Sequence, residues 1–565
     1  MDNQRILLWA ALGFLLLQLW TSWQIDYGPK PEPAVAENLQ PGLADPTIDQ
    51  GSNTQGAISQ DSPAAPVDDL PVPVSPTASE GQTAVTGEVD SATAGQDVVV
   101  TTDTFEVTLS TKGGDINTVK LLQYPTSLET PDDPFVLMSN RDAEYFVAQS
   151  GLQSTGASAP NHHALFSVEQ TDYQLGGQDE LRVPMTWQSD EGITVIKTFV
   201  FQRDRYLISV EYEIQNNTGE ALSFNQYRQL RRKPVTDDET QSFIYTFIGG
   251  VISTDEDPYS KIDFNDFDDT GHQTQTKGGW AAIIEHYFLG AWIPQQEETN
   301  KIYSMSRNHR YIIGLQSGSI QVPAGDVGQM QSGFFVGPKI QDRMKAVAPK
   351  LDLTVDYGFL SVLAKPIFWL LQKIHSIVGN WGWAIVGVTM CIKLIFYKLS
   401  EASYRSMARM RKLQPQLASL KERHGDDRAK MGQATMELYK KEKVNPLGGC
   451  LPILVQIPVF ISLYWVLLES VELRQAPWIL WIQDLSLKDK FYVLPLLMGI
   501  TMFIQQKLNP APVDPIQAKV FMAMPFIFTI FFAFFPAGLV LYWVVNNTLS
   551  IAQQYYITRH VLAEK

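Results

Sequence analysis

Cysteine is almost absent from this sequence, with only Cys391 and Cys450 among 565 residues. The large region at 98–349 has none, so it cannot hold a disulfide in any redox compartment. Two isolated cysteines also exclude a zinc site built from cysteine pairs. A Gly-rich phosphate loop followed by lysine is missing as well, and Lys112-Gly113-Gly114 is only a turn signal. We therefore expect no metal, no cofactor and no nucleotide-driven chemistry.

Aromatic residues are missing between Tyr27 and Phe105. Residues 26–97 instead contain twelve acidic residues, one lysine and ten prolines. Such a segment buries too little apolar surface to offset the entropy lost on ordering. We expect a disordered acidic tether at 26–97.

An apolar run, Ile6–Trp20, follows Arg5 within residues 1–25. It is either a signal peptide or a membrane anchor. The nearby Trp20, Trp23 and Tyr27 are typical of a membrane interface and favour an uncleaved anchor with its N-terminus inside.

Residues 98–349 show the period-two pattern of β-strands. Phe105, Val107 and Leu109 alternate with polar residues, as do apolar residues between Tyr206 and Ile214. Turn signals separate these runs, which predicts an antiparallel β-sandwich. The pair His162-His163 lacks a third ligand at a suitable spacing, so we interpret it as an ordinary loop pair.

Hydropathy after the sandwich changes to helical periods. Residues 350–379 form an amphipathic pattern, which suits a helix on the outer membrane interface or one packed on the sandwich. Apolar segments then predict membrane helices at 380–399, 449–470, 491–508, 519–536 and 538–557. The segments that join and follow them are a periplasmic loop at 471–490, a cytoplasmic loop at 509–518 and a cytoplasmic tail at 558–565.

Basic residues are concentrated at 400–448, which contains eleven lysines and arginines but only six acidic residues. Short loops rich in Lys and Arg stay in the cytoplasm. The apolar stripes in this region predict a cytoplasmic helical hairpin. The whole pattern predicts a six-span α-helical membrane protein with both termini inside and a periplasmic β-sandwich domain. We expect the hairpin to offer a cytoplasmic contact surface formed by Arg405, Arg409, Arg411 and Lys412.

Acidic residues are missing from the apolar cores of the expected spans, yet Lys393 lies in one of them. A charged side chain near the bilayer centre costs about 2.5–3.5 kcal/mol on insertion scales. The lysine either extends its stem to the headgroups or lies in a wet recess. Other polar groups at a similar inner depth favour a recess closed on the outer side, although Asn and Gln also join helices to one another. The expected recess residues are Lys393, Thr389, Gln456, Gln505, Asn546, Tyr542 and Trp543.

Several long motifs resemble the YidC/Oxa/Alb membrane protein insertases, in particular the bacterial members with a large exported domain. The motifs are MDNQRILL at the start, GGWAAIIEHYFLGAWIP (278–294), VGP (336–338), APKLDLTVDYG (348–358), HSIVGNWGWAI (375–385), MARMRKLQPQ (407–416), KVNPLGGCLPILVQIPVF (443–460), SVELRQAPW (470–478) and FPAGLVLYW (535–543). They cover nearly the whole chain except the tether.

The resemblance implies a non-enzymatic insertase and chaperone in the bacterial inner membrane. It implies a hydrophilic groove that is open to the cytoplasm and to lipid, where a cation attracts acidic residues of a nascent membrane protein. It also implies work with the Sec translocon and its accessory subunits, with ribosomes and with lipids, without specific nucleic-acid binding, and an exported β-super-sandwich similar to sugar-binding folds. The family usually has arginine where this chain has Lys393, so charge is kept but the planar fork of donors is lost.

Two other functions fit parts of the pattern. A transporter with an exported receptor domain predicts inverted repeats and a midplane site, and the two halves show no self-similarity. An exported enzyme or sugar receptor with a membrane anchor would need far fewer spans than this chain has.

Overall fold

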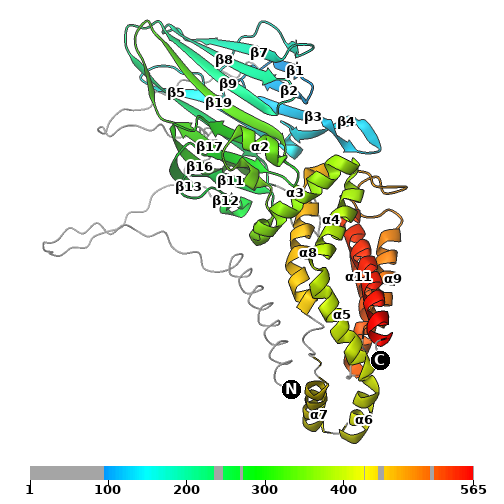
Figure 1. The fold of residues 1–565 in the computed structure, drawn as a ribbon. Helices are drawn as coiled ribbons and strands as arrows, with labels where there is room; N and C mark the ends of the chain where they lie inside the picture. Colours follow the sequence, from blue (N-terminus) through cyan, green and yellow to red (C-terminus); the bar gives the residue numbers. More distant parts are fainter. Residues whose placement is uncertain are drawn as a thin grey trace, which may run out of the picture. The chain divides into compact units, whose positions relative to one another are not determined.

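The computed structural model describes residues 95–234, 246–267, 272–424, 427–442, 444, 451–509 and 515–563 (Figure 1). The expected anchor at 1–25 and nearly all of the tether at 26–97 lie outside these residues. The chain divides into two compact units. One unit contains Arg409–Pro446, and the other contains Asp69–Ala408 and Leu447–Lys565.

An eleven-stranded sheet forms one layer of the β-domain, in the order β13-β16-β17-β10-β5-β3-β2-β1-β6, with β18 beside β10 and β4 beside β3. Its strands are β1 (Asp97–Thr101), β2 (Phe105–Ser110), β3 (Ile116–Ser127), β4 (Thr130–Met138), β5 (Phe146–Thr155), β6 (Asp172–Gln174), β10 (Leu222–Arg232), β13 (His272–Lys277), β16 (Thr299–Arg307), β17 (Arg310–Ser317) and β18 (Ile320–Val322).

An eight-stranded sheet forms the second layer, in the order β12-β11-β14-β15-β19-β9-β8-β7. Its strands are β7 (Glu180–Gln188), β8 (Ile193–Gln202), β9 (Leu207–Asn216), β11 (Gly249–Ser253), β12 (Ser260–Ile262), β14 (Trp280–Ile284), β15 (Phe288–Pro294) and β19 (Val327–Pro338). Short 3-10 turns occur at η1 (Asp142–Glu144) and η3 (Phe264–Asp266).

The predicted sandwich is confirmed, and its core follows the period-two pattern. Phe105, Val107 and Leu109 of β2 are at most 1% exposed. In β9 the inward residues Ile208, Val210, Tyr212 and Ile214 are equally buried, and their neighbours face outward. One pair departs from the expected antiparallel order, because β1 and β6 run parallel. That pairing joins segments about 70 residues apart, which local alternation cannot reveal.

A lysine lies inside the sandwich. Lys197 of β8 occupies an inward position between Val195 and Phe199, and its ammonium donates to the backbone oxygens of Gly113 (3.0 Å), Gly114 (2.8 Å) and Ser150 (2.9 Å). Both glycines have positive φ (76° and 59°), a conformation that suits glycine. Burial lowers the pKa of Lys197 to about 7. This lysine therefore fixes the Gly113-Gly114 turn, at a site where the alternation predicts an apolar residue.

His162 also has a structural contact. Its Nδ1 lies 2.7 Å from the hydroxyl of Tyr227, and its ring is 4.1 Å from that of His163. Within the described residues, no cluster of three or more possible metal ligands occurs.

A run of short helices leads from the sandwich to the helical region. It contains α2 (Gln341–Val347), η4 (Leu351–Thr354), η5 (Gly358–Leu360) and α3 (Ser361–Val378). The amphipathic helix was expected across 350–379, but its regular part begins only at Ser361. The side chains Phe359, Val362 and Ile377 are 72%, 83% and 84% exposed, which leaves an apolar face uncovered within the described chain.

The helix expected at 380–399 is broken. α4 (Trp381–Ile395) ends four residues early, and α5 (Tyr397–Lys412) continues after a bend of 67°. Phe396 closes α4 through its backbone N–H, which reaches the oxygens of Ile392 and Leu394. No single helix of the described chain has both the length and the apolar composition to cross a membrane by itself, whereas α4 and α5 together satisfy both measures.

Two further helices form the Arg409–Pro446 unit together with the end of α5. They are α6 (Gln414–His424) and α7 (Arg428–Lys441), and they pack on each other. Asp427 caps α7 by accepting from the backbone N–H groups of Ala429 and Lys430. The expected single first helix of the hairpin is interrupted at Leu413.

The last four helices are α8 (Leu451–Glu469), α9 (Val493–Leu508), α10 (Pro515–Phe532) and α11 (Ala537–Ala563), with η7 (Val471–Leu473) after α8. α11 packs on α4 and α9, and α10 packs on α9. A Cβ at Gly499 of α9 would lie 1.9 Å from the hydroxyl of Thr529, so these two helices meet where a side chain is missing. The expected helix at 519–536 begins and ends earlier, and the one at 538–557 extends to Ala563.

Candidate functional site

A chain of hydrogen-bonded polar groups joins α4, α11 and α8. The ammonium of Lys393 donates to the hydroxyl of Ser550 (2.8 Å), which donates to the backbone oxygen of Asn546 (2.7 Å). The side-chain oxygen of Asn546 accepts from Nε2 of Gln456 (2.9 Å). The four residues come from three helices that lie far apart in the sequence.

Helical spacing explains how α11 presents this chain. Asn546, Ser550 and Gln554 are four residues apart, so they share one face of the helix. They are 9%, 2% and 1% exposed, although most faces of such a helix are apolar. Gln554 extends the row by donating to Asn509 (2.9 Å). The polar face of α11 is therefore turned toward the other helices.

Lys393 lies in the last turn of α4, where the helix dipole favours a cation. Its ammonium is directed at α11 by the bond to Ser550, and within the described chain no ion pair with a carboxylate involves it. Two opposite charges 4 Å apart attract by about 4 kcal/mol at an effective dielectric constant near 20. Within the described chain, the hydrogen-bond partner of this ammonium is a hydroxyl and not a carboxylate.

Two aromatic residues of the expected site lie in an apolar cluster. The rings of Tyr542 and Trp543 are 5.9 and 4.9 Å from that of Phe460, and Trp543 also contacts Phe532 at 5.7 Å. Tyr542 is only 2% exposed. These rings border the polar chain at Gln456.

Two other expected residues take no part in the chain. Thr389 is buried, and its hydroxyl donates to the backbone oxygen of Ile385 one turn back (2.7 Å), so its own helix satisfies it. Gln505 is half-buried on α9, where the hydrogen bonds of the described residues do not join it to Lys393. The polar contact between α9 and α11 is made instead by Thr501, whose hydroxyl accepts from the side-chain amide of Asn547 (3.4 Å).

The expected basic contact residues are exposed. Arg405, Arg409, Arg411 and Lys412 all lie on α5 and all face outward. Arg405 forms an ion pair with Glu401 one turn away (3.0 Å). A surface pair of this kind contributes less than about 1 kcal/mol, so it leaves the arginine free to exchange partners.

Sequence reasoning missed Ser550 as a site residue and missed a buried ion pair, Lys339–Glu469 (3.3 Å). The four-residue spacing from Asn546 could have identified Ser550. Nothing in the sequence alone brings Lys339 and Glu469 together, because 130 residues separate them.

The fold and the site define a class: a β-sandwich domain followed by apolar helices that share a buried polar chain with one cation. A family model described as "YidC periplasmic domain" matches residues 97–370, and one described as "60Kd inner membrane protein" matches 373–564. The membrane protein insertase YidC of Nitrosococcus oceani is 50% identical over 100% of both chains. That of Methylococcus capsulatus is 49% identical over 99% of both.

A solved structure described as an active YidC insertase with the first transmembrane domain resolved is also similar. Its sequence identity is 18% and its TM-score 0.38, over 82% of this chain and 93% of that one.

The chain belongs to the YidC family of membrane protein insertases. It is thus an inner-membrane protein with a periplasmic β-sandwich domain, and it is an insertase rather than an enzyme. The transporter alternative is not favoured.

Proposed function

We propose that this chain inserts nascent inner-membrane proteins through an inner-leaflet groove whose cation is Lys393. In this proposal the chain has six spans with both termini in the cytoplasm, and the α6–α7 region is cytoplasmic. The polar tail of a substrate enters the groove while its apolar helix moves along the lipid-facing helices. No covalent chemistry is needed, because the groove acts only by reducing the cost of desolvation.

The distribution of charge supports this topology. Eleven basic residues between 400 and 448 favour the cytoplasm, and family membership puts the β-sandwich on the other side. Lys393 is five residues from Lys398, or about 7–8 Å along a helix, which puts it in the inner half of the bilayer.

The shortness of two helices supports a low energetic barrier for moving a polar tail across the membrane. α4 has 15 residues and α9 has 16, which correspond to about 22 and 24 Å. The hydrocarbon core of a bilayer is about 30 Å thick. Helices that are too short thin the bilayer around them, and a thinner bilayer shortens the path of a polar tail.

Electrostatics supports selection of acidic tails. An acidic residue at the bilayer centre costs about 2.5–3.5 kcal/mol, and pairing with Lys393 at about 4 Å offsets an amount of the same size. Ser550 keeps the ammonium directed inward when no substrate is bound.

The outer surface of the helices supports contact with lipid and with the substrate helix. Met522, Phe526 and Ile530 of α10 are 61%, 66% and 69% exposed. Exposed apolar area of this extent requires an apolar environment. The exposed basic residues Arg405 and Arg409 suit a ribosome or an anionic lipid surface, and the Sec translocon is the expected partner for larger substrates.

The observation that carries the proposal is the bond from Lys393 to Ser550, which keeps an uncompensated cation among apolar helices. To test it, cells depleted of the native protein express Lys393→Glu, Lys393→Met or the matched control Lys393→Arg. Insertion of a single-span substrate with two acidic residues in its tail is compared with that of a substrate without them. For the acidic tail we expect a loss of about 10- to 100-fold in Lys393→Glu and near-normal insertion in Lys393→Arg.

The neutral tail serves as the internal control, because it should insert normally in every variant. Equal insertion of both tails by Lys393→Glu would remove electrostatic attraction from the mechanism.

A further inference from the structure

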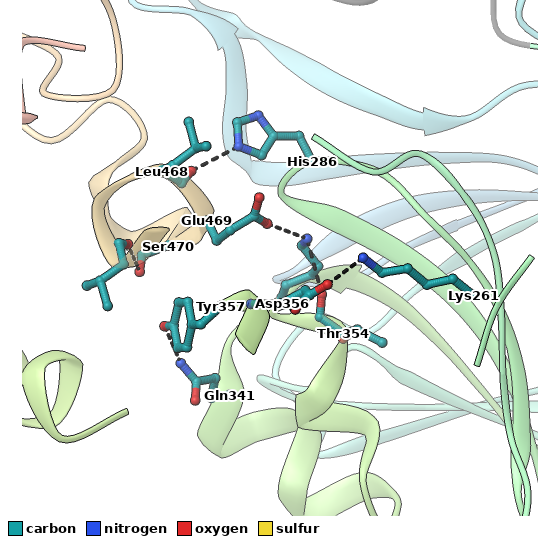
Figure 2. Close-up of polar contacts among 12 residues, drawn as sticks. Lys261, His286, Gln341, Thr354, Asp356, Tyr357, Leu468, Glu469 and Ser470 are labelled. Atoms are coloured by element: carbon teal, nitrogen blue, oxygen red, sulfur yellow. Dashed lines mark hydrogen bonds and ion pairs between the residues drawn. The ribbon is translucent and has the colours of Figure 1, made fainter. Parts of the chain in front are cut away.

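The C-terminal end of α8 is capped by side chains from the β-sandwich. The last carbonyls of a helix have no partner within it. Nε2 of His286, in the turn between β14 and β15, lies 2.9 Å from the oxygen of Leu468 and donates to it, as Figure 2 shows. Lys339, directly after β19, donates to Glu469 (3.3 Å) and to the backbone oxygen of Thr354 (3.3 Å). Since Phe288 of β15 pairs with Pro338 of β19, both contacts come from the same end of this strand pair.

The ion pair in this cap is buried. The side chains of Lys339 and Glu469 are 2% and 7% exposed. Each buried charge requires the other as its partner, because removing one leaves the other buried without compensation. A lysine at a helix C-terminus is also favoured by the helix dipole. The Lys339–Glu469 ion pair therefore favours one position of α8 relative to this end of the β15–β19 strand pair.

The segment that connects the β-sandwich to α3, residues 341–360, is held at the same place. Asp356 forms an ion pair with Lys261 of β12 (2.5 Å), and the hydroxyl of Tyr357 accepts from Gln341 (2.7 Å). Figure 2 shows these residues beside Glu469 and Ser470. Contacts on both sides of the segment make the cap a rigid assembly rather than a single contact.

A second contact fixes the chain just after α8. Arg474 donates to the backbone oxygen of Pro125 in β3 (2.8 Å), and Gln475 donates to the same oxygen (2.9 Å). The guanidinium of Arg474 lies 5.6 Å from the ring centres of both Phe135 and Phe288. Two separate strand pairs of the sandwich thus hold the end of α8.

The other half of α8 carries Gln456, which bonds to Asn546 in the polar chain of Lys393. Gln456 and Glu469 are 13 residues apart, or about 20 Å along the helix. Both residues belong to one continuous helix, in which Pro458 donates no backbone hydrogen bond and Ser462 donates to the oxygen of Pro458 (2.8 Å). A displacement of the capped end therefore changes the position of Gln456.

We infer that Lys339, His286 and Glu469 are positioning residues through which the β-sandwich fixes α8 and thereby the groove. This inference rests on the proposed function. It assigns the domain a mechanical role in insertion, without any ligand of its own.

The test uses the full chain with Lys339→Met, Glu469→Gln and the charge swap Lys339→Glu/Glu469→Lys. Lys345→Met is the matched control, since Lys345 of the same region forms only an exposed pair with Asp342 (3.6 Å). Hydrogen exchange of residues 459–470 is measured in lipid nanodiscs, and insertion of a substrate with a neutral tail is measured in depleted cells.

We expect hydrogen exchange to be about 100-fold faster in each single variant than in the wild-type chain. In the charge swap it should return close to the wild-type rate, and in Lys345→Met it should be unchanged. Insertion per molecule should fall in the single variants and recover in the swap. Unchanged exchange would overturn the cap. Faster exchange with normal insertion per molecule would overturn the positioning role and leave a merely structural contact. If Lys393→Glu inserts acidic tails normally while the cap variants fail as expected, the proposed electrostatic function is wrong and the cap stands.

Discussion

Protonation of His286 should weaken the contact between the β-sandwich and α8, because the imidazole that donates to the oxygen of Leu468 is buried next to the charge of Lys339. Burial, together with the nearby charge of Lys339, lowers the pKa of His286 from 6.5 to about 4. When the contact opens, the imidazole returns to its ordinary pKa near 6.5. Between these values the open state binds more protons than the closed one. The contribution of His286 to the stability of the closed state is therefore lost as the pH falls from 7 toward 4.

The magnitude follows from the two pKa values. At pH 5 the contribution of His286 alone should cost the closed state about 2 kcal/mol relative to pH 7.5, which corresponds to roughly a 30-fold increase in opening. Hydrogen exchange of residues 280–290 and 464–470 measures this increase after correction for the intrinsic rate at each pH. Burial raises the pKa of Glu472 to about 7, and this acid has an effect of opposite sign and similar size between pH 7 and pH 5, so the histidine effect must be read from a comparison with a variant.

A variant isolates the histidine. In His286→Gln the amide can still donate to the oxygen of Leu468 but does not titrate, whereas Glu472 is unchanged. We expect the opening of the wild-type chain to increase about 30-fold more than that of the variant when the pH falls from 7.5 to 5. The reasoning is refuted if the wild-type chain and His286→Gln show the same dependence on pH.

Two further predictions concern helix packing. Gly499→Ala should destabilise the α9–α10 contact by about 1–3 kcal/mol, because the new Cβ meets the hydroxyl of Thr529, and adding Thr529→Ala should restore most of the loss; thermal unfolding in detergent measures both. Asp489→Ala should cost about 2–4 kcal/mol, since this buried carboxylate accepts from Trp481 Nε1 (2.9 Å) and from the backbone N–H groups of Phe491 (3.0 Å) and Leu494 (2.7 Å) at the start of α9. Asp489→Asn should cost less, and equal losses in the two Asp489 variants would contradict the capping role.

Local periodicity predicted much of the fold. Strands such as β2 and β9 alternate because one face is buried, and that pattern needs no knowledge of partners. The parallel pair β1–β6 and the buried Lys197 escaped prediction, since both depend on contacts between distant segments. The bend after Ile395 escaped for another reason: hydropathy continues smoothly through Phe396 and Tyr397, so composition does not mark where the helix ends.

The site was predicted in part. Depth along each apolar segment placed Lys393, Gln456 and Asn546 at similar levels, and the structure links them through Ser550. The depth of a residue in the membrane does not show which way its side chain points around the helix axis. Thr389 was therefore expected at the site, although its hydroxyl donates to the backbone of its own helix. The cap of α8 could not be predicted, because it depends on contacts between residues that are 130 and 182 positions apart in the sequence.

The most direct measurement is site-specific photocrosslinking from position 456 to a stalled nascent chain with an acidic tail, with position 530 on the exposed face of α10 as the comparison. We predict that position 456 crosslinks to the acidic tail, that position 530 crosslinks to the apolar helix of the substrate, and that Lys393→Glu abolishes only the first. Acidic tails that crosslink to position 530 but never to position 456, or that reach 456 equally well in Lys393→Glu, would contradict the account.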